Sequence, residues 1–389
     1  MSVVQRKLSG TFKDFFDSEK SSGVVLIICT IVSLLVTNSS LGANYLSIWH
    51  ASILGLSVEH WINDGLMAIF FLLIGLELRR ELRSGELSDA KAALLPVFAA
   101  LGGIFTPALI HFVFNYGTPT QAGIGIPMAT DIAFALGVLA LLGRRVPVSL
   151  KIFLTALAVI DDLGAIIVIA VFYTTKLSAF YLTGAILSFA MLFVINRFFR
   201  VMNLIPYLLG GALMWFLMLE SGVHTTIAGV LLAFTIPFSG GEDDENSPSH
   251  RLEYFLNKPV AFVILPIFAL ANTGIVAGAD WFQNLFSANS AGIIFGLALG
   301  KPTGIMLFSF LVVSFGICRL PPDLNWKHIF GAGLLGGIGF TMSIFITNLA
   351  FTGNADVINA SKFAILLASL TSGTIGFLWL RLMELKAES

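Results

Sequence analysis

The amino-acid sequence predicts an all-α polytopic membrane protein with about twelve transmembrane helices. Of its 389 residues, 57% are hydrophobic and 12% are charged, whereas a soluble domain carries about 25% charged residues. The mean hydropathy is +0.90. Such a chain cannot cover a water-exposed surface, and its net charge of −1 gives no sign of nucleic-acid binding. Two cysteines in apolar runs, Cys29 and Cys318, exclude a disulfide framework.

Twelve apolar runs have the length of about 20 residues that a helix needs to cross a bilayer. They lie at residues 15–36, 58–78, 93–114, 121–142, 148–173, 179–196, 201–219, 222–238, 259–279, 289–312, 328–350 and 357–380. Only Glu220–Val223 separates the seventh run from the eighth, so a single bent segment is an alternative there. The ninth run can also begin earlier, near Arg251.

The basic residues alternate with these spans. Nineteen of the 22 lysines and arginines fall in loops on one side, Lys176 and Lys362 fall on the other, and Lys301 lies within a span. Loops rich in Lys and Arg face the cytoplasm. The alternation therefore predicts twelve spans with both termini cytoplasmic. No low-complexity linker divides the chain, so we expect residues 1–389 to form one transmembrane domain.

Glycine and proline interrupt the fourth and eleventh spans. Gly125 and Pro127 lie in the fourth, and Gly337 and Gly339 precede Thr341 in the eleventh. These residues free backbone groups that lipid cannot satisfy. One interpretation is ordinary glycine and proline of packed transmembrane helices, and the other is a pair of unwound helices that line a site. The two spans are the middle members of spans 3–5 and 10–12. Paired interruptions of this kind indicate a transporter with inverted-topology repeats, although little sequence identity links the halves.

Four ionisable residues lie near the middle of their spans: Asp131, Asp161, Asp162 and Lys301. Each costs about 2.5–3.5 kcal/mol at a helix centre, and an ion pair explains only two of them. Carboxylate oxygens are hard ligands that suit Na⁺ or Li⁺. Two adjacent carboxylates in a low-dielectric site cannot both stay ionised at low cost, so the same oxygens can hold protons or a cation. Competition for one site predicts coupled exchange.

Three motifs carry a resemblance to a known family. They are Pro127-Met-Ala-Thr130-Asp131-Ile-Ala-Phe134, Leu157-Ala-Val-Ile-Asp161-Asp162-Leu-Gly164 and Gly337-Ile-Gly-Phe-Thr341-Met-Ser-Ile-Phe345. Together they resemble the NhaA family of sodium/proton antiporters over essentially the whole chain. The resemblance implies a protein of the bacterial inner membrane with spans 4 and 11 unwound and crossing. It also implies electrogenic exchange of cytoplasmic Na⁺ or Li⁺ for external H⁺, activated at alkaline pH.

The resemblance further implies roles for the midspan residues. Asp162 corresponds to the family's cation ligand. Asp161 corresponds to a carboxylate that takes part in proton and cation exchange close to the transporter lysine, here Lys301. Thr130 and Asp131 correspond to the Thr-Asp pair of the interrupted span, where the Asp offsets positive helix ends. We expect no cofactor beyond the transported ions.

A second charged group is predicted at the cytoplasmic ends of two spans. Glu77, Arg80 and Glu81 have the i, i+3, i+4 spacing of one helix face, and Arg251 and Glu253 begin the ninth span. The residues alone are equally compatible with a solvated helix end that carries local ion pairs.

For this second group, the resemblance implies a pH response carried by its three glutamates and by His224. His250 stands where family members commonly have Lys, which predicts a shifted activation pH because histidine titrates near neutrality. Asp64 also matches a family position, without a clear role. Between the first two spans, Thr37–Ser57 contains two short runs, Asn44–Trp49 and Ser52–Ser57, that can pair as a hairpin. In the family this region is a hairpin at a homodimer contact.

Three other functions compete with antiport. A cation-coupled symporter of a small organic solute also uses midspan carboxylates, but no solute pocket is recognisable. An intramembrane aspartyl protease using Asp131 and Asp161 usually shows a Gly-x-Gly-Asp pattern, which is absent. A channel favours symmetric filters rather than one asymmetric site. We therefore predict a transporter rather than an enzyme, whose partners are Na⁺, Li⁺, H⁺, the lipid bilayer and a second copy of the chain.

Overall fold

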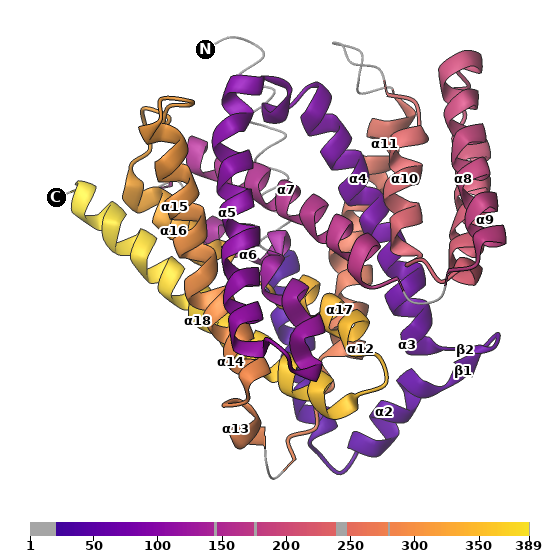
Figure 1. The fold of residues 1–389 in the computed structure, drawn as a ribbon, viewed down its shortest axis with the longest axis horizontal. Helices are drawn as coiled ribbons and strands as arrows, with labels where there is room; N and C mark the ends of the chain where they lie inside the picture. Colours follow the sequence, from indigo (N-terminus) through magenta and orange to yellow (C-terminus); the bar gives the residue numbers. More distant parts are fainter. Residues whose placement is uncertain (1–20, 144–145, 175–176, 239–246, 279–280, 389) are drawn as a thin grey trace. The chain divides into compact units, whose positions relative to one another are not determined.

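The computed structural model describes residues 21–143, 146–174, 177–238, 247–278 and 281–388 (Figure 1). These residues are mostly helical, because a helix satisfies its backbone polar groups internally where no water is available. The chain divides into two compact units. Unit 1 comprises the described residues of Met1–Asn38, Lys91–Gly164 and Thr273–Ser389, and unit 2 those of Ser39–Ala90 and Ala165–Asn272.

Seven helices in the described residues are long and apolar enough to cross a bilayer, or up to ten spans if each bent pair counts as one. The seven are Val58–Arg83, Lys91–Asn115, Val148–Phe172, Ala179–Phe199, Pro248–Asn272, Ala288–Ser314 and Ala355–Met383. The bent pairs are Ser21–Thr37 with Gly42–His50, Pro119–Met128 with Ile132–Leu141, and Trp326–Gly336 with Phe340–Ala350. The predicted seventh and eighth spans are shorter apolar helices, Ile205–Ser221 and Thr226–Thr235. The count of twelve spans and the inverted repeat therefore stay predictions.

Unit 1 is built around the two broken segments. Its elements are α5 (Ala90–Asn115), η3 (Pro119–Met128), α6 (Ile132–Leu141), the first part of α7 (Val148–Phe172), α13 (Trp281–Asn284), α14 (Ala288–Phe295), η8 (Gly296–Gly300), α15 (Lys301–Ser314), α16 (Trp326–Gly336), α17 (Phe340–Ala350) and α18 (Ala355–Glu388). Helix α16 packs against α15 and α18, and α17 packs against η3. Gly102 and Gly304 permit close approach of α5 and α15, because a Cβ on either glycine would overlap the backbone carbonyl of the other.

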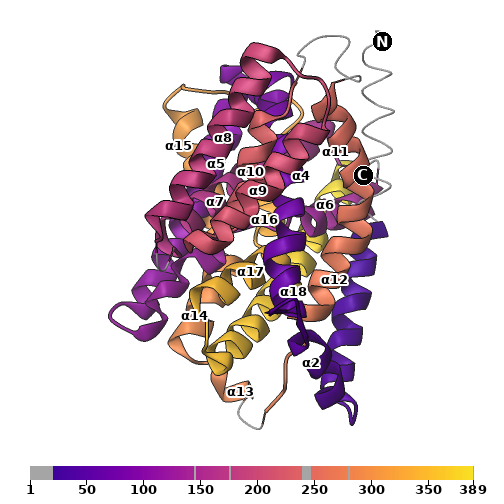
Figure 2. The same ribbon diagram turned by 90° about the vertical axis from the view of Figure 1, so that its right-hand side faces the viewer.

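Unit 2 consists of paired helices and one small hairpin. Its elements are α2 (Gly42–His50), β1 (Ser52–Ile53), β2 (Leu56–Ser57), α3 (Val58–His60), η1 (Trp61–Leu66), α4 (Met67–Arg83), η2 (Glu86–Ser88), the end of α7, α8 (Ala179–Val194), η5 (Ile195–Phe199), α9 (Ile205–Ser221), α10 (Thr226–Thr235), α11 (Pro248–Pro259), η7 (Val260–Ile264) and α12 (Leu265–Asn272). Helices α8 and α9 lie side by side (Figures 1 and 2), and α10 packs against α4 and α9. Gly229 brings α10 close to α4, because a Cβ there would overlap the Ala68 carbonyl.

The predicted hairpin needs a correction. Its strands lie wholly within residues 52–57, where Ser52 pairs with Ser57 and Ile53 with Leu56. Leu54 and Gly55 have φ values of 53° and 86°, which suit a two-residue turn matching the twist of the strands. The expected strand Asn44–Trp49 is wrong, because these residues belong to α2. No turn residues separate Trp49 from Ser52, so those two runs cannot fold back on each other.

Two further sequence assignments change. The ninth span begins at Pro248, in line with the earlier start considered near Arg251, and ends at Asn272 rather than 279. Lys362, counted on the side opposite to the nineteen basic residues, is buried on α18. The basic residues of the first 20 positions, together with Arg144, Arg145 and Lys176, lie outside the described residues.

Candidate functional site

The two broken segments of unit 1 meet at their breaks. The path from η3 to α6 bends by 42°, and the path from α16 to α17 bends by 47°. The backbone N–H of Asp131 donates to the Ile338 carbonyl over 2.7 Å, which joins one break to the other. Backbone groups released by each interruption are therefore satisfied by the opposite segment.

Asp131 serves the starts of two helices with one carboxylate. Its Oδ1 accepts from the Phe134 N–H at 3.0 Å, which makes it the N-cap of α6. Its Oδ2 accepts from the Thr341 N–H at 3.1 Å and from the Thr341 hydroxyl, at the start of α17. A negative charge beside two helix N-termini offsets the positive ends of both.

Asp161 and Lys301 form a buried ion pair beside these breaks. Lys301 Nζ lies 2.7 Å from Asp161 Oδ2, and both side chains are 0% exposed. Thr130 Oγ1 lies 2.7 Å from the same carboxylate oxygen and 2.8 Å from the Gly336 carbonyl. Lys301 Nζ also donates to the Met128 carbonyl, at the end of η3. The lysine thus contacts both a carboxylate and the negative end of a helical segment.

Asp162 adds a further buried charge. It follows Asp161 on α7, where neighbouring side chains point about 100° apart. It is 0% exposed, and its charge acts on Lys301. Among the described residues, none donates a hydrogen bond to the buried Oδ1 of Asp161. With Asp131 the group contains three carboxylates and one ammonium, so full ionisation would leave an excess of two negative charges that protons or a small hard cation can offset.

The glycines and the proline of the broken segments permit close packing at this site. Gly125 and Pro127 lie within η3, and a Cβ on Gly296 of η8 would come within 2.7 Å of Pro127 Cβ. A Cβ on Gly337 would lie 2.8 Å from Ser372 Oγ, and one on Gly339 would lie 3.2 Å from the Ala129 carbonyl.

Ser343 adds a bond between the broken segments that sequence reasoning did not assign. Its hydroxyl donates to the Ile126 carbonyl over 2.7 Å, which fastens η3 to α17. The only sequence signal was the position of Ser343 two residues after Thr341, within a motif already singled out.

In unit 2, four of the predicted pH-response residues are close together; we call Glu77, Arg80, Glu81 and Glu253 the acidic cluster. Arg80 Nη1 lies 2.8 Å from Glu253 Oε1, and Arg80 Nη2 lies 3.1 Å from Glu81 Oε1. Glu77 is half-buried one turn earlier on α4, within electrostatic range of the other three. The guanidinium therefore binds carboxylates from α4 and α11.

His250 and Arg251 are not part of this cluster. Arg251 is exposed, and within the described parts of the chain neither residue forms an ion pair with the four members. The backbone N–H of His250 donates to the Ser247 hydroxyl, the N-cap of α11, at 3.2 Å. These two residues lie at the start of α11, whereas Glu253 points into the cluster.

Sequence reasoning missed a role for Arg79 beside this cluster. Arg79 is buried and donates to the Ala233 carbonyl at 2.8 Å and to the Ile236 carbonyl, at the end of α10. A guanidinium at a helix C-terminus offsets its negative end. The signal was present in the sequence, since Arg79 directly precedes Arg80, but Arg79 was counted only among the basic residues of one side.

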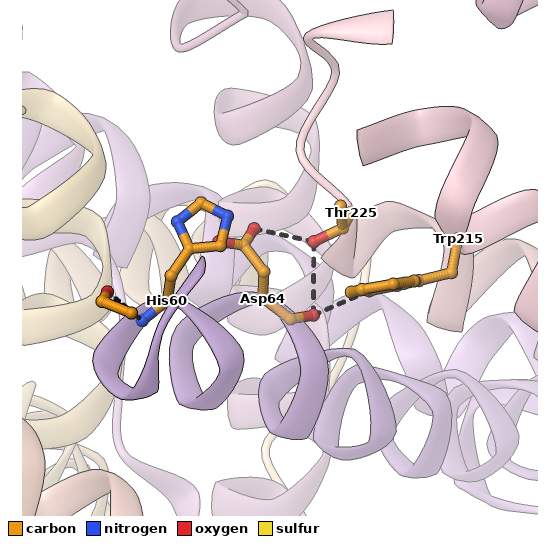
Figure 3. A network of polar contacts seen from close by, with 5 residues as sticks. His60, Asp64, Trp215 and Thr225 are labelled. Atoms are coloured by element: carbon orange, nitrogen blue, oxygen red, sulfur yellow. Dashed lines mark hydrogen bonds and ion pairs between the residues drawn. The ribbon is translucent and has the colours of Figure 1, made fainter. Parts of the chain in front are cut away.

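Asp64 lies at the centre of a polar network in unit 2 (Figure 3). The Thr225 hydroxyl donates to Asp64 Oδ1 at 2.7 Å, and Trp215 Nε1 donates to the Asp64 carbonyl at 2.9 Å. His60 Nε2 lies 3.3 Å from Asp64 Oδ2. Asp64 lies in η1, whose wider turns leave the Asp64 carbonyl within reach of Trp215 on α9 and of Thr225, the N-cap of α10.

His224 is the neighbour of Thr225 but makes a separate contact. Its Nε2 lies 2.8 Å from the Tyr173 carbonyl, just after α7. The predicted pH-response residues of unit 2 therefore occupy distinct places: the acidic cluster, the start of α11 and the start of α10.

Comparison with known proteins gives a consistent family. The model of the family described as Na⁺/H⁺ antiporter 1 matches residues 13–380. A Na⁺/H⁺ antiporter NhaA from Dechloromonas aromatica is 69% identical over 384 residues, covering 99% of both chains. One from Flavobacterium psychrophilum is 59% identical, covering 96% of this chain and 97% of that protein.

A solved structure shares the fold at low sequence identity. The sodium proton antiporter MjNhaP1 from Methanocaldococcus jannaschii, at pH 8, superposes with a TM-score of 0.56. The match covers 96% of this chain and 100% of that chain, at 12% identity.

Proposed function

The chain belongs to the NhaA family of Na⁺/H⁺ antiporters, and on that premise we propose that it exchanges cytoplasmic Na⁺ or Li⁺ for external H⁺. It is a transporter rather than an enzyme. We further propose that exchange is electrogenic, is activated at alkaline pH, and takes place in the bacterial inner membrane with both chain termini cytoplasmic. The single observation that carries the proposal is the buried group of three carboxylates and one lysine where two broken helices meet.

The ion pair of Asp161 and Lys301 suggests how cation and proton compete. Asp161 Oδ2 holds the lysine and Thr130, whereas Oδ1 accepts no hydrogen bond from the described residues. A Na⁺ ion bound by Asp162 and this oxygen would neutralise the partner of Lys301. A buried ammonium that loses its counter-ion gives up its proton more readily. Protons leaving Asp162 and Lys301 as one Na⁺ binds would move net charge in each cycle.

The contact between Lys301 and the Met128 carbonyl supports a second role for the same lysine. There the ammonium offsets the negative end of η3, which is a structural contribution independent of proton release. We favour the transport role, because Asp161, the partner of Lys301, also belongs to the proposed Na⁺ site. A lysine with a purely structural role would not need a partner of that kind. A substitution that keeps the side-chain bulk but removes the titratable proton separates the two roles.

The acidic cluster supports a separate pH response in unit 2. Three glutamates share one arginine there, so the state of protonation decides how many carboxylates compete for the guanidinium. We propose that the three glutamates of this cluster, Glu77, Glu81 and Glu253, adjust the pH at which exchange starts. We propose the same role for His224 at the start of α10 and for His250 and Arg251 at the start of α11. The hairpin of β1 and β2 is proposed as the contact of a homodimer.

Counter-flow in proteoliposomes tests the proposal. Vesicles loaded with Na⁺ are diluted into Na⁺-free buffer, and a pH dye and a voltage dye are read in parallel. Antiport predicts that protons enter the vesicles as Na⁺ leaves, so the interior becomes more acidic and a voltage develops. The same result is expected at alkaline pH with Li⁺ in place of Na⁺. K⁺-loaded vesicles and protein-free vesicles are the controls. Na⁺ flow without proton counter-flow would contradict antiport, and counter-flow without voltage would contradict electrogenic exchange.

A further inference from the structure

A second buried polar group lies in unit 1, in residues to which the exchange mechanism assigns no role. His111 of α5 is 0% exposed, and its Nε2 lies 3.2 Å from Asn289 Oδ1 at the start of α14. The amide Nδ2 of Asn289 donates to the Ser361 hydroxyl of α18 over 2.7 Å. The Ser361 hydroxyl in turn donates to the Val357 carbonyl at 2.7 Å. The chain of bonds connects α5, α14 and α18.

The donor and acceptor roles along this series of hydrogen bonds determine which ring nitrogen of His111 carries the proton. Ser361 uses its one hydrogen on the Val357 carbonyl, so it accepts from the amide group of Asn289. The amide oxygen of Asn289 is therefore the atom that faces His111 and can only accept. His111 must donate from Nε2, which leaves Nδ1 as an acceptor that no described residue approaches with a hydrogen bond.

Asn115, one helical turn after His111, makes a parallel connection. Its Nδ2 donates to the Ala288 carbonyl at 3.2 Å, at the first residue of α14. Its Oδ1 accepts from the Thr120 hydroxyl of η3 at 2.7 Å. His111 and Asn115 thus tie α5 to the start of α14, and Asn115 also ties it to the start of η3.

The ring of His111 also packs directly on the backbone of η3. A Cβ on Gly123 would lie 3.1 Å from His111 Cε1 and 2.7 Å from the Phe351 ring. Contacts of that length leave no room for a side chain, so the imidazole lies where one would project. His111 therefore contacts η3 through its ring and α14 through its Nε2 hydrogen bond.

Both segments held by His111 end at the exchange site. From Gly123, η3 continues for five residues, about 10 Å at the rise of a 3₁₀-helix, to Met128, whose carbonyl accepts from Lys301. From Asn289, the chain continues through η8 to Lys301, twelve residues or about 18 Å of helix. The two segments are thus joined at one end by His111 and at the other by the bond between Lys301 and Met128.

We propose that His111 is a positioning residue for cation exchange. By holding Gly123 and Asn289 at fixed positions, it sets the register of η3 against the span that carries Lys301. That register places the lysine between the Met128 carbonyl and Asp161. The inference rests on the proposed function, because the lysine pair is taken to be the site where cation and proton compete.

The test compares three substitutions of His111 with a matched control. His111→Gln keeps an N–H donor at the position of Nε2, whereas His111→Asn places its amide nitrogen at the position of Nδ1, and His111→Phe keeps only the ring. Ser309→Ala is the control, since it removes a buried hydroxyl on α15 that has no hydrogen-bond partner among the described residues. The readouts are the half-saturating Na⁺ concentration and maximal rate in proteoliposomes, and amide hydrogen exchange of residues 119–128.

We expect the Phe and Asn variants to raise the half-saturating Na⁺ concentration about tenfold, with a maximal rate within about twofold, because Asn289 Oδ1 is left without its donor. Hydrogen exchange of residues 119–128 should be faster in both. The Gln variant and Ser309→Ala should match the wild type, and Ser361→Ala, which acts at the far end of the chain of bonds, should show about a threefold increase.

Several outcomes would overturn the inference. Equal behaviour of the Gln and Asn variants would show that the Nε2 donor is irrelevant, and wild-type Na⁺ dependence in His111→Phe would show that the register does not depend on His111. If the Phe and Asn variants fold poorly, Ser361→Ala replaces them, and unchanged Na⁺ dependence there would equally overturn it. If the wild type exchanged no Na⁺, the proposed function itself would be refuted. Unchanged hydrogen exchange of residues 119–128 in the Phe and Asn variants would refute only the positioning role of His111.

Discussion

Asp131, Asp161, Asp162 and Lys301 of unit 1 are the proposed exchange group. This group and the acidic cluster of unit 2 hold charges in opposite ways. In the exchange group, the charged side chains are buried and their partners include backbone groups released by two helix breaks. In the acidic cluster, the charges sit on continuous helices, and Arg80 is 36% exposed. The first site is fully enclosed and surrounded by fixed backbone dipoles, whereas the second is partly exposed to solvent at Arg80.

This difference predicts how each region responds to change. A charge in a dry site has no solvent to replace a lost partner, so removing one member should stop a step or alter its stoichiometry. A partly exposed pair is screened by water and salt and contributes about 1 kcal/mol or less. Changes in the acidic cluster should therefore adjust the pH profile and leave the exchange reaction itself intact.

The largest effect is expected for Asp162→Asn. The substitution removes a buried carboxylate that is proposed to bind the cation directly, so affinity for Li⁺ should fall by about a hundredfold or more. Isothermal titration with Li⁺ on the purified protein measures it, with the exposed Asp323→Asn as the matched control. Heat of binding close to that of the wild type would remove Asp162 from the site.

Lys301→Gln should have the next largest effect and separates the two roles of the lysine. Glutamine keeps most of the bulk but carries no titratable proton. If Lys301 is a proton carrier, exchange becomes electroneutral or stops. If it only stabilises the end of η3, the melting temperature falls and the surviving protein still generates a voltage. Voltage per Na⁺ ion moved is measured in proteoliposomes beside thermal unfolding, and an unchanged ratio with a lower melting temperature contradicts the carrier role.

Glu253→Gln should shift the pH profile without lowering the maximal rate. The substitution removes a negative charge that contacts Arg80, so the acidic cluster carries less net negative charge and attracts protons less strongly. The pH of half-maximal exchange should therefore move down, by about half a unit for a partly exposed pair. Loss of activity at every pH, with normal folding, would place Glu253 in the transport step instead.

His250→Lys should cause the smallest shift. The histidine is outside the acidic cluster, and a lysine there adds a permanent positive charge whose effect is screened over about 8–10 Å by physiological salt. We expect a downward shift of about 0.2 pH units, reduced further by added choline chloride. A shift larger than that of Glu253→Gln would reverse the order that the contacts indicate.

Much of the exchange group could be predicted from the sequence, because its signals are rare in a membrane span. An ionisable residue in an apolar run is costly, and that cost singled out Asp131, Asp161, Asp162 and Lys301. The same reasoning passed over His111, although it is a titratable residue inside the third predicted span. Histidine is less costly when neutral, so its signal was weaker than that of the carboxylates.

Local features were decided by residues close together in the chain. The composition required helices in lipid, and Asp131 caps α6 through an N–H only three residues away. The turn of the small hairpin likewise depends on two adjacent residues with positive φ. Periodicity still could not place that hairpin, because an alternating pattern over six residues does not distinguish a strand from a short helix such as α2.

The tertiary structure alone decided which distant residues became partners. Lys301 contacts Asp161 across 140 positions, Asp131 contacts Thr341 across 210, and His111 contacts Asn289 across 178. Such contacts depend on where whole helices pack, which glycines such as Gly102 and Gly304 permit only once the segments have come together. Sequence patterns report the energy of one residue in its own segment, whereas a partnership also depends on the position and orientation of another segment, which packing alone determines.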